Sequence, residues 1–231
     1  MERPYIICHM TTSLDGKVTG SFLEQENVQG AIEQYYEIHR GYKADAFACG
    51  RITMEGSFTG GFQPDLTPFA DAVISYEDYK ADTEAEFFAV AFDRKGRLGW
   101  TVSRIADEDP GYDNAHIIEV LCEGVNPAYL VYLQSIGVSY IFAGKEEMDV
   151  ALALKKLKTL FGIETLLLEG GSVLNGAFLR ADVIDALSLV VAPVTAEKED
   201  KPVFWNGERK AFCLDEVKQF ADSVWIKYRK V

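Results

Sequence analysis

Residues 162–194 hold the pattern that most restricts how this chain can fold. An apolar run over 165–168 ends in a Glu-Gly-Gly turn (169–171). An amphipathic segment then begins at Ser172, and a second apolar run covers 186–194. This succession predicts a strand, a glycine turn, a helix and another strand. Such a unit is typical of α/β folds in which the strands are parallel.

The glycine turn is also the first candidate for a binding site. Adjacent glycines let a backbone pass very close to a ligand. The following helix offers unpaired N–H groups and a partial positive charge at its N-terminus. Together these features suit a phosphate or a pyrophosphate. The alternative is a plain tight turn without a ligand.

A second turn of similar character follows a predicted buried strand over 45–49. It reads Gly50-Arg51-Ile52-Thr53, so that a guanidinium and a hydroxyl come directly after a glycine. Arg51 can pair with a phosphate in bidentate fashion, and Thr53 can donate another hydrogen bond. The turn over 93–97 is locally basic as well, and its pattern favours an exposed hairpin turn over a ligand contact.

The loop after the first predicted strand (5–10) is rich in hydroxyl groups and carries one acid and one base. Loops at strand ends commonly carry binding groups in α/β folds. The alternative is a Ser-Leu-Asp-Gly turn that closes a hairpin. The side chains of interest in this loop are Thr11, Ser13, Asp15 and Lys17.

The rest of the chain alternates strand and helix patterns and ends in strands alone. We expect a mixed, mostly parallel sheet with helices on both faces, antiparallel C-terminal strands, and one domain over residues 1–231. The remaining predicted elements are helices over 27–42, 126–135 and 149–161, strands over 72–75, 87–92, 117–121 and 138–143, and closing strands over 212–220 and 223–228.

Composition narrows the class of partner. A net charge of −13 argues against broad contact with nucleic acid or an anionic membrane, since both need clustered Lys and Arg. No apolar run approaches the ~18–20 residues of a membrane helix. No zinc-type spacing of Cys and His appears. Cys8, Cys49 and Cys213 lie in apolar surroundings and are predicted to be buried thiols, so we expect a cytoplasmic protein without a metal.

Short motifs in a fixed order carry a family resemblance. They are Ser13-Leu14-Asp15-Gly16-Lys17, Ala44-Asp45-Ala46, Gly50-Arg51-x-Thr53, Leu168-Glu169-Gly170-Gly171, Asp185-Ala186-Leu187 and Ala192-Pro193. With these motifs the chain resembles the reductase domain of bacterial riboflavin biosynthesis, which shares the dihydrofolate-reductase fold. The resemblance implies a three-layer α/β/α sandwich and an NADPH-dependent reductase that forms a homodimer.

The resemblance also assigns residues to the cofactor. The first turn would hold the adenosine-phosphate half and the second turn the pyrophosphate, while Arg51 would favour NADPH over NADH through the 2′-phosphate. Glu169 would either bridge to a ribose hydroxyl or cap backbone N–H groups. The implied cofactor-binding residues are Gly50, Arg51, Thr53, Glu169, Gly170, Gly171, Ser172 and Val173.

The first-strand loop would lie beside the nicotinamide and the small-molecule substrate. Thr11 and Ser13 would bind the substrate. Lys17 would stabilise a developing oxyanion, and Asp15 would orient it or relay a proton.

The substrate stays open on sequence alone. Riboflavin-pathway reductases typically carry an arginine after the Gly-x-x-Thr turn, and residues 61–68 contain none. A phosphate buried without a cation is costly. The substrate is therefore either the aminouracil ribosyl-phosphate or another small carbonyl or imine. The His-x-Glu and Pro-Cys-x-x-Cys motifs of a deaminase are absent from the sequence.

Three other functions remain as alternatives. The first is dihydrofolate reductase, in which Glu33 or Glu37 would bind a pteridine. The second is a nucleotide-binding domain of this fold without catalysis. The third, a protein-interaction module, predicts no cofactor binding at all.

Overall fold

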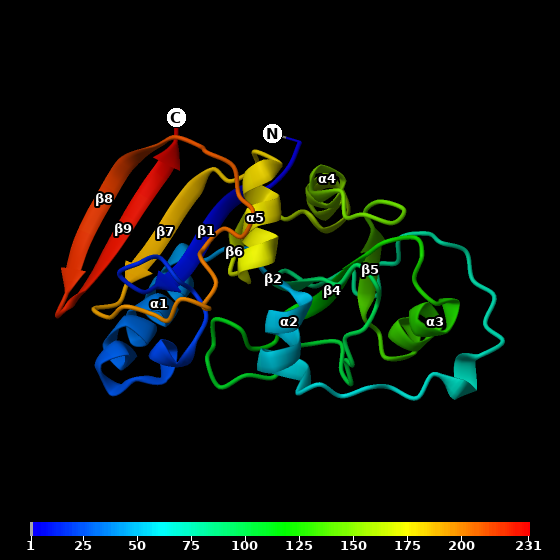
Figure 1. The fold of residues 1–231 in the computed structure, drawn as a ribbon. Helices are drawn as coiled ribbons and strands as arrows, with labels where there is room; N and C mark the ends of the chain where they lie inside the picture. Colours follow the sequence, from blue (N-terminus) through cyan, green and yellow to red (C-terminus); the bar gives the residue numbers. More distant parts are fainter. Residues whose placement is uncertain (1) are drawn as a thin grey trace. The chain divides into compact units, whose positions relative to one another are not determined.

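The computed structural model describes residues 2–231, and the chain forms two compact units (Figure 1). The first unit contains residues 45–164 together with the N-terminal residues up to Pro4. The second unit contains residues 5–44 and 165–231. Each unit is built around hydrogen-bonded strands of its own.

The first unit is built on four parallel strands in the order β5-β4-β3-β2. Every residue of β3, β4 and β5 is buried, which explains why β3 is a continuous apolar run and why β4 and β5 show no alternation of apolar and polar residues. The strands are β2 (Ala46–Gly50), β3 (Phe88–Phe92), β4 (His116–Leu121) and β5 (Ser139–Phe142). The helical segments are α2 (Arg51–Met54), η3 (Glu55–Thr59), η4 (Thr67–Phe69), α3 (Pro127–Ser135) and α4 (Val150–Phe161).

The two longer helices of this unit begin at side-chain caps. Asn126 Oδ1 accepts a hydrogen bond from the Ala128 amide at 3.0 Å, and Pro127 occupies the first helical position of α3. Asp149 Oδ1 accepts from the Leu152 amide at 2.9 Å at the start of α4. These caps satisfy amides that have no partner inside the helix.

The second unit contains both parallel and antiparallel strands, in the order β6-β1-β7-β9-β8. The pairs β1–β6 and β1–β7 are parallel, whereas β7–β9 and β8–β9 are antiparallel. The strands are β1 (Tyr5–Thr12), β6 (Thr165–Leu168), β7 (Ala186–Val191), β8 (Phe212–Phe220) and β9 (Ser223–Lys230). The helical segments are η1 (Ser21–Glu24), η2 (Glu26–Val28), α1 (Gln29–Tyr42) and α5 (Ser172–Arg180).

Helix α1 buries its apolar side against β7 and β9. Val28 and Ala31 pack with Val190, Ala192 and Trp225 in one buried cluster. Glu33 and Glu37 are both exposed on α1, so neither is the inward-facing carboxylate that a buried pteridine would need.

The expected mixed α/β fold, mostly parallel and closed by antiparallel C-terminal strands, is confirmed, and two details are corrected. No strand forms over 72–75: this segment lies in a long connection, and Val73 is 99% exposed. A short, mostly apolar run without a neighbouring strand has no partner for backbone hydrogen bonds. Cys213 is exposed because it lies on β8, which forms the end of the strand order, whereas Cys8 and Cys49 are buried as predicted. Within residues 2–231, no helix has the length and apolar character needed to cross a membrane.

Helix α5 is pressed against the segment that follows residue 202. The Trp205 amide donates to the Ser172 carbonyl at 3.0 Å. A Cβ added to Gly176 would lie 1.9 Å from the Trp205 carbonyl oxygen. Only a residue without a side chain allows this close approach.

Gly176→Ala should therefore destabilise the protein by about 1–3 kcal/mol, although alanine is the better helix former. Gly41→Ala on α1 is the matched control, because a Cβ there has open space. The control should be neutral or stabilising by up to about 1 kcal/mol. Urea unfolding measures both variants. A Gly176→Ala protein as stable as the control would contradict this seating of α5.

Candidate active site

Strand register brings two polar turns together at the carboxyl edge of the first unit. Gly50, the last residue of β2, pairs with Phe92, the last residue of β3. The chain after each strand therefore leaves from the same edge. Between these turns lies an open cavity of about 270 Å³, lined by Arg51, Phe92, Asp93, Arg94, Lys95 and Arg97. Four of its six lining side chains are cationic, in a protein of strongly negative net charge. The residues after β2 and β3 thus form a basic pocket suited to a phosphate.

A buried carboxylate shapes the loop that carries three of these cations. Asp93 is 2% exposed and accepts hydrogen bonds from the Lys95 amide at 3.3 Å, the Leu98 amide at 2.8 Å and the Arg97 amide. The predicted hairpin turn over 93–97 is wrong, because β3 runs parallel to both of its neighbours. The loop instead folds around Asp93, whose carboxylate accepts hydrogen bonds from the loop's backbone amides.

The cations of the basic pocket are only weakly engaged elsewhere. Arg51 Nη1 lies 2.7 Å from Glu55 Oε2, and Arg94 pairs with the largely exposed Glu147. Within residues 2–231, no ion pair involves Lys95 or Arg97. The Arg94–Glu147 pair is exposed and the Arg51–Glu55 pair is partly exposed, and ion pairs that solvent reaches contribute little stability, so they compete poorly with a doubly charged phosphate. Thr53, partly buried on α2, follows Arg51 by two residues.

The glycine turn of the second unit lies between β6 and α5, as the sequence predicts. Gly170 has φ 98°, and a Cβ there would lie 3.3 Å from the Met10 Cε atom. Gly171 precedes the first residue of α5 and has no side chain to cap the helix. The hydroxyl of Ser172 already donates to the Pro202 carbonyl, and the side chain of Val173 is exposed. What this turn offers a ligand is therefore backbone N–H groups.

Glu169 anchors the glycine turn to α1. Its Oε1 atom lies 2.6 Å from His39 Nδ1, and both side chains are almost fully buried. The carboxylate thus lies in the interior of the second unit. His39 was not anticipated from the sequence, although its place on the apolar side of the predicted 27–42 helix was a usable signal. A hydrogen bond buried this deeply fixes the position of the residue that precedes the two glycines.

The loop over 13–17 is tied to residues 194–203 by several hydrogen bonds. Asp15 Oδ1 accepts from the Ala196 amide at 2.9 Å and from the Ser13 hydroxyl at 2.8 Å. These donors, the Ala196 amide first and the Ser13 hydroxyl second, hold the pKa of Asp15 below its usual value. Asp15 is therefore a carboxylate at neutral pH and can orient a neighbour better than it can donate a proton.

Lys17 faces the same segment. Its ammonium group donates to the Asp200 carbonyl at 2.7 Å and to the Lys198 carbonyl at 3.3 Å. The charged run over residues 197–201 therefore contacts a candidate catalytic residue. Thr11 Oγ1, near the end of β1, is buried without a hydrogen-bond partner among the described residues.

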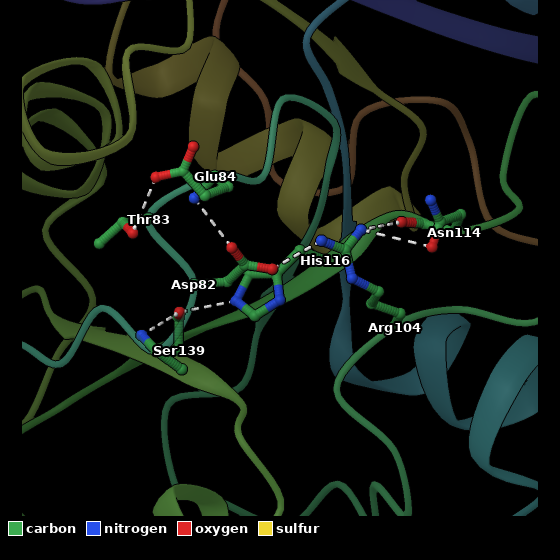
Figure 2. A network of polar contacts seen from close by, with 8 residues as sticks. Asp82, Thr83, Glu84, Arg104, Asn114, His116 and Ser139 are labelled. Atoms are coloured by element: carbon green, nitrogen blue, oxygen red, sulfur yellow. Dashed lines mark hydrogen bonds and ion pairs between the residues drawn. The ribbon is translucent and has the colours of Figure 1, made fainter.

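A second polar cluster lies at the amino ends of β4 and β5 and offers no catalytic group. Figure 2 shows the ring of His116 pointing at the Ser139 hydroxyl, with Nε2 and Oγ 2.7 Å apart. Nearby, the Arg104 guanidinium pairs with Asp82 at 2.6 Å and donates to the Asn114 carbonyl at 2.8 Å. Neither His116 nor Ser139 is accessible, since they are 1% and 0% exposed. The cluster lies at the amino ends of the strands, whereas the basic pocket lies at their carboxyl ends.

The polar turns at carboxyl strand ends, together with the mixed sheet, define an α/β protein with the fold of the dihydrofolate-reductase-like reductases. The family model of the RibD C-terminal domain matches residues 4–225. The chain therefore belongs to the RibD C-terminal domain family. Within residues 2–231 no group of three or more His, Cys, Asp or Glu side chains is placed to hold a metal ion.

Curated relatives in this family are reductases. The 2,5-diamino-6-ribosylamino-4(3H)-pyrimidinone 5′-phosphate reductase of Methanothermobacter thermautotrophicus is 23% identical over 229 residues, which cover 99% of this chain and 92% of the relative. A reductase of the same name from Aquifex aeolicus is 33% identical over 76 residues, which are 34% of its length.

Solved structures agree on the fold. A pyrimidine reductase-like protein of Corynebacterium diphtheriae superposes with a TM-score of 0.69 at 16% identity, covering 99% of this chain and 92% of the other. The riboflavin biosynthesis reductase Rib7 of Saccharomyces cerevisiae gives 0.67 at 15% identity, covering 100% and 91%. RibD of Acinetobacter baumannii gives 0.64 at 22% identity, and this chain spans 59% of its length.

The buried histidine of the second polar cluster makes a pH-dependent contribution to stability. Burial, aided by Arg104 and Lys80 and opposed by Asp82, lowers the pKa of His116 to about 4. The unfolded chain therefore binds more protons below the ordinary histidine pKa, and the stability that neutral His116 provides is lost as the pH falls from about 6.5 towards 4.

His116→Gln cannot titrate but can still hydrogen-bond to Ser139. We expect its urea midpoint to fall less than that of the wild type between about pH 7 and pH 5. Some slope should remain, because burial also lowers the pKa of His9. Equal slopes for the two proteins would show that His116 is not held neutral by the fold.

Proposed function

We propose that this protein is an NADPH-dependent reductase that transfers a hydride to the C=N or C=O carbon of a ribosylamino-pyrimidine 5′-phosphate. The observation that carries the proposal is the basic pocket beside Arg51. A 2′-phosphate distinguishes NADPH from NADH, and its recognition requires cations at one place. The membership of the family and the names of the curated relatives support the reductase class.

The residues present fit this cofactor. The basic pocket would take the 2′-phosphate, through Arg51 with Arg94, Lys95 and Arg97. The backbone N–H groups at Gly171 and Ser172 would take the pyrophosphate, since they lie at the start of a nine-residue helix. Gly50 and Gly170 would allow close backbone approach, and Thr53 and Val173 would border the cofactor. Glu169 would act through its hydrogen bond with His39 rather than through a ribose hydroxyl.

Bound NADPH supplies the hydride, and the protein positions the acceptor and manages the proton. One hydride and one proton convert a C=N group into an amine, or a C=O group into an alcohol, with NADP⁺ as the other product. Lys17 would stabilise negative charge on the acceptor. Asp15, ionised at neutral pH, would orient Lys17 and the Ser13 hydroxyl, while Thr11 would hydrogen-bond the substrate with its unpartnered hydroxyl.

Two pyrimidine phosphates are candidate substrates. The curated relatives are named for the 2,5-diamino-pyrimidinone, whereas the sequence resemblance suggests the aminouracil that deamination would give. Residues 61–68 contain no arginine that could bind the ribose phosphate. Another cationic side chain of the protein must therefore bind it. We favour the 2,5-diamino compound, because the matched relative spans almost the whole chain. The expected homodimer, the cytoplasmic location and the single domain stay predictions.

Arg51→Ala should weaken NADPH binding about 10- to 100-fold and leave NADH binding nearly unchanged, because only NADPH carries a phosphate for the basic pocket. Nicotinamide fluorescence measures both affinities. Arg209→Ala is the matched control, since it removes the same charge from an exposed position of the other unit.

The control should change neither affinity. Equal losses for NADPH and NADH in Arg51→Ala would remove Arg51 from the 2′-phosphate site. A wild-type protein that binds neither dinucleotide would contradict the proposed function as a whole.

A further inference from the structure

Asn175 is a fully buried amide that makes no side-chain hydrogen bond within the described part of the chain. Its exposed fraction is 0%, and neither Oδ1 nor Nδ2 has a partner. Its backbone is ordinary, since the Asn175 amide donates to the Gly171 carbonyl at 3.0 Å as the first helical bond of α5. A buried amide without partners is destabilising, so an asparagine at this position calls for a physical reason.

The side chain lies directly behind the glycine turn. A Cβ built on Gly170 would be 3.9 Å from Asn175 Nδ2, with the Met10 side chain on the same side. The Asn175 carboxamide therefore lies close to the Gly170 end of the turn. Asn175 also lies one helical turn from the N-terminus of α5, where an anion would meet the backbone N–H groups.

The other polar side chains around this turn are already committed. The Glu169 carboxylate is paired with His39, and the Ser172 hydroxyl donates to the Pro202 carbonyl. The amide of Asn175 is therefore the nearby polar group with hydrogen-bonding capacity left. It has two donors and an acceptor, which match the mixed N–H and C=O groups of a peptide turn.

We propose that Asn175 is a positioning residue for dinucleotide binding: its carboxamide hydrogen-bonds the backbone of the Gly170–Gly171 turn and holds it in the conformation that receives the pyrophosphate. This inference rests on the proposed function and deepens it. These hydrogen bonds form when the ligand is bound. The unpaired amide destabilises the unliganded protein, and this destabilisation is relieved when the ligand binds.

This assignment predicts opposite effects on stability and on binding. Leucine has nearly the shape of asparagine and no polar atoms, so Asn175→Leu should leave the urea midpoint of the unliganded protein unchanged or higher. The same variant should bind NADPH about tenfold more weakly or worse. An asparagine kept only for packing would show the reverse, with lower stability and unchanged affinity.

A second pair of variants separates hydrogen bonding from shape. Asn175→Ala and Asn175→Ser differ by one hydroxyl and leave similar space. If the side chain acts by hydrogen bonding, the serine variant should bind NADPH several-fold more tightly than the alanine variant, with about equal urea midpoints. This pair also keeps the test decisive if the leucine variant fails to fold.

The probe that localises the effect is 2′-AMP, which carries the 2′-phosphate and no pyrophosphate. Its affinity should be unchanged in all three Asn175 variants, because it would use only the basic pocket. Leu179→Met, at the far end of α5, is the control for general disturbance of the helix and should alter neither ligand.

The outcomes separate this inference from the proposed function. Wild-type binding of NADPH and 2′-AMP, with NADPH affinity reduced in Asn175→Leu and partly recovered in Asn175→Ser relative to Asn175→Ala, supports the inference. Unchanged NADPH affinity in the variants, equal affinities of the serine and alanine variants, or parallel losses for 2′-AMP would overturn it and leave the proposed function intact. If the wild type binds neither ligand, both fail.

Discussion

The parallel register of the strands is the constraint on which the candidate site depends. Parallel strands end at a common edge, so the turns that follow them are brought together however far apart they lie in the sequence. The pairing of Gly50 with Phe92 sets the Arg51 turn beside the loop of residues 93–97. A shift of one residue would send alternate side chains to the other face and break up the basic pocket.

Buried polar groups then set the shape of each turn. The Asp93 carboxylate accepts hydrogen bonds from the backbone amides of its own loop. The Glu169 side chain, next to the glycine turn, contacts His39. The exposed Asp15 and the partly buried Lys17 also bind the backbone of the 194–203 segment. The two buried contacts cost desolvation and offset it only in a well-defined geometry. The polar side chains at these turns therefore fix backbone positions, and the backbone N–H groups and the cations are what the turns offer to the proposed ligand.

The strands, helix starts and glycine turns could be predicted because they depend on local pattern. The apolar runs of β1, β3 and β6, the helix starts at Asn126 and Asp149, and the two turns all lie where the sequence places them. Long-range contacts could not be predicted in this way. The basic character of residues 94–97 is visible in the sequence, but its meeting with Arg51 depends on strand order. The isolated run over 72–75 looked like a strand and has no neighbour to pair with.

Burial explains what else the sequence could not reveal. Glu119 and Asn175 look like ordinary polar residues of a strand and a helix, yet both are buried. Glu119 shows the consequence: burial, with the nearby Asp93 charge, raises its pKa well above the usual value. Such environments arise only when several elements pack together. The candidate site thus combines turns that can be predicted from the sequence with buried side chains whose contacts depend on the fold.

The central claim is that this chain reduces a ribosylamino-pyrimidine phosphate with a hydride from NADPH. The most direct test supplies NADPH deuterated at the transferred C4 position, with the 2,5-diamino compound and the aminouracil in separate reactions. Mass spectrometry and NMR of the products then follow the label. We expect one deuterium at the carbon of the former C=N or C=O group in the reduced product of at least one substrate. Oxidation of NADPH without label in either product, or no reduced product from either, would contradict it.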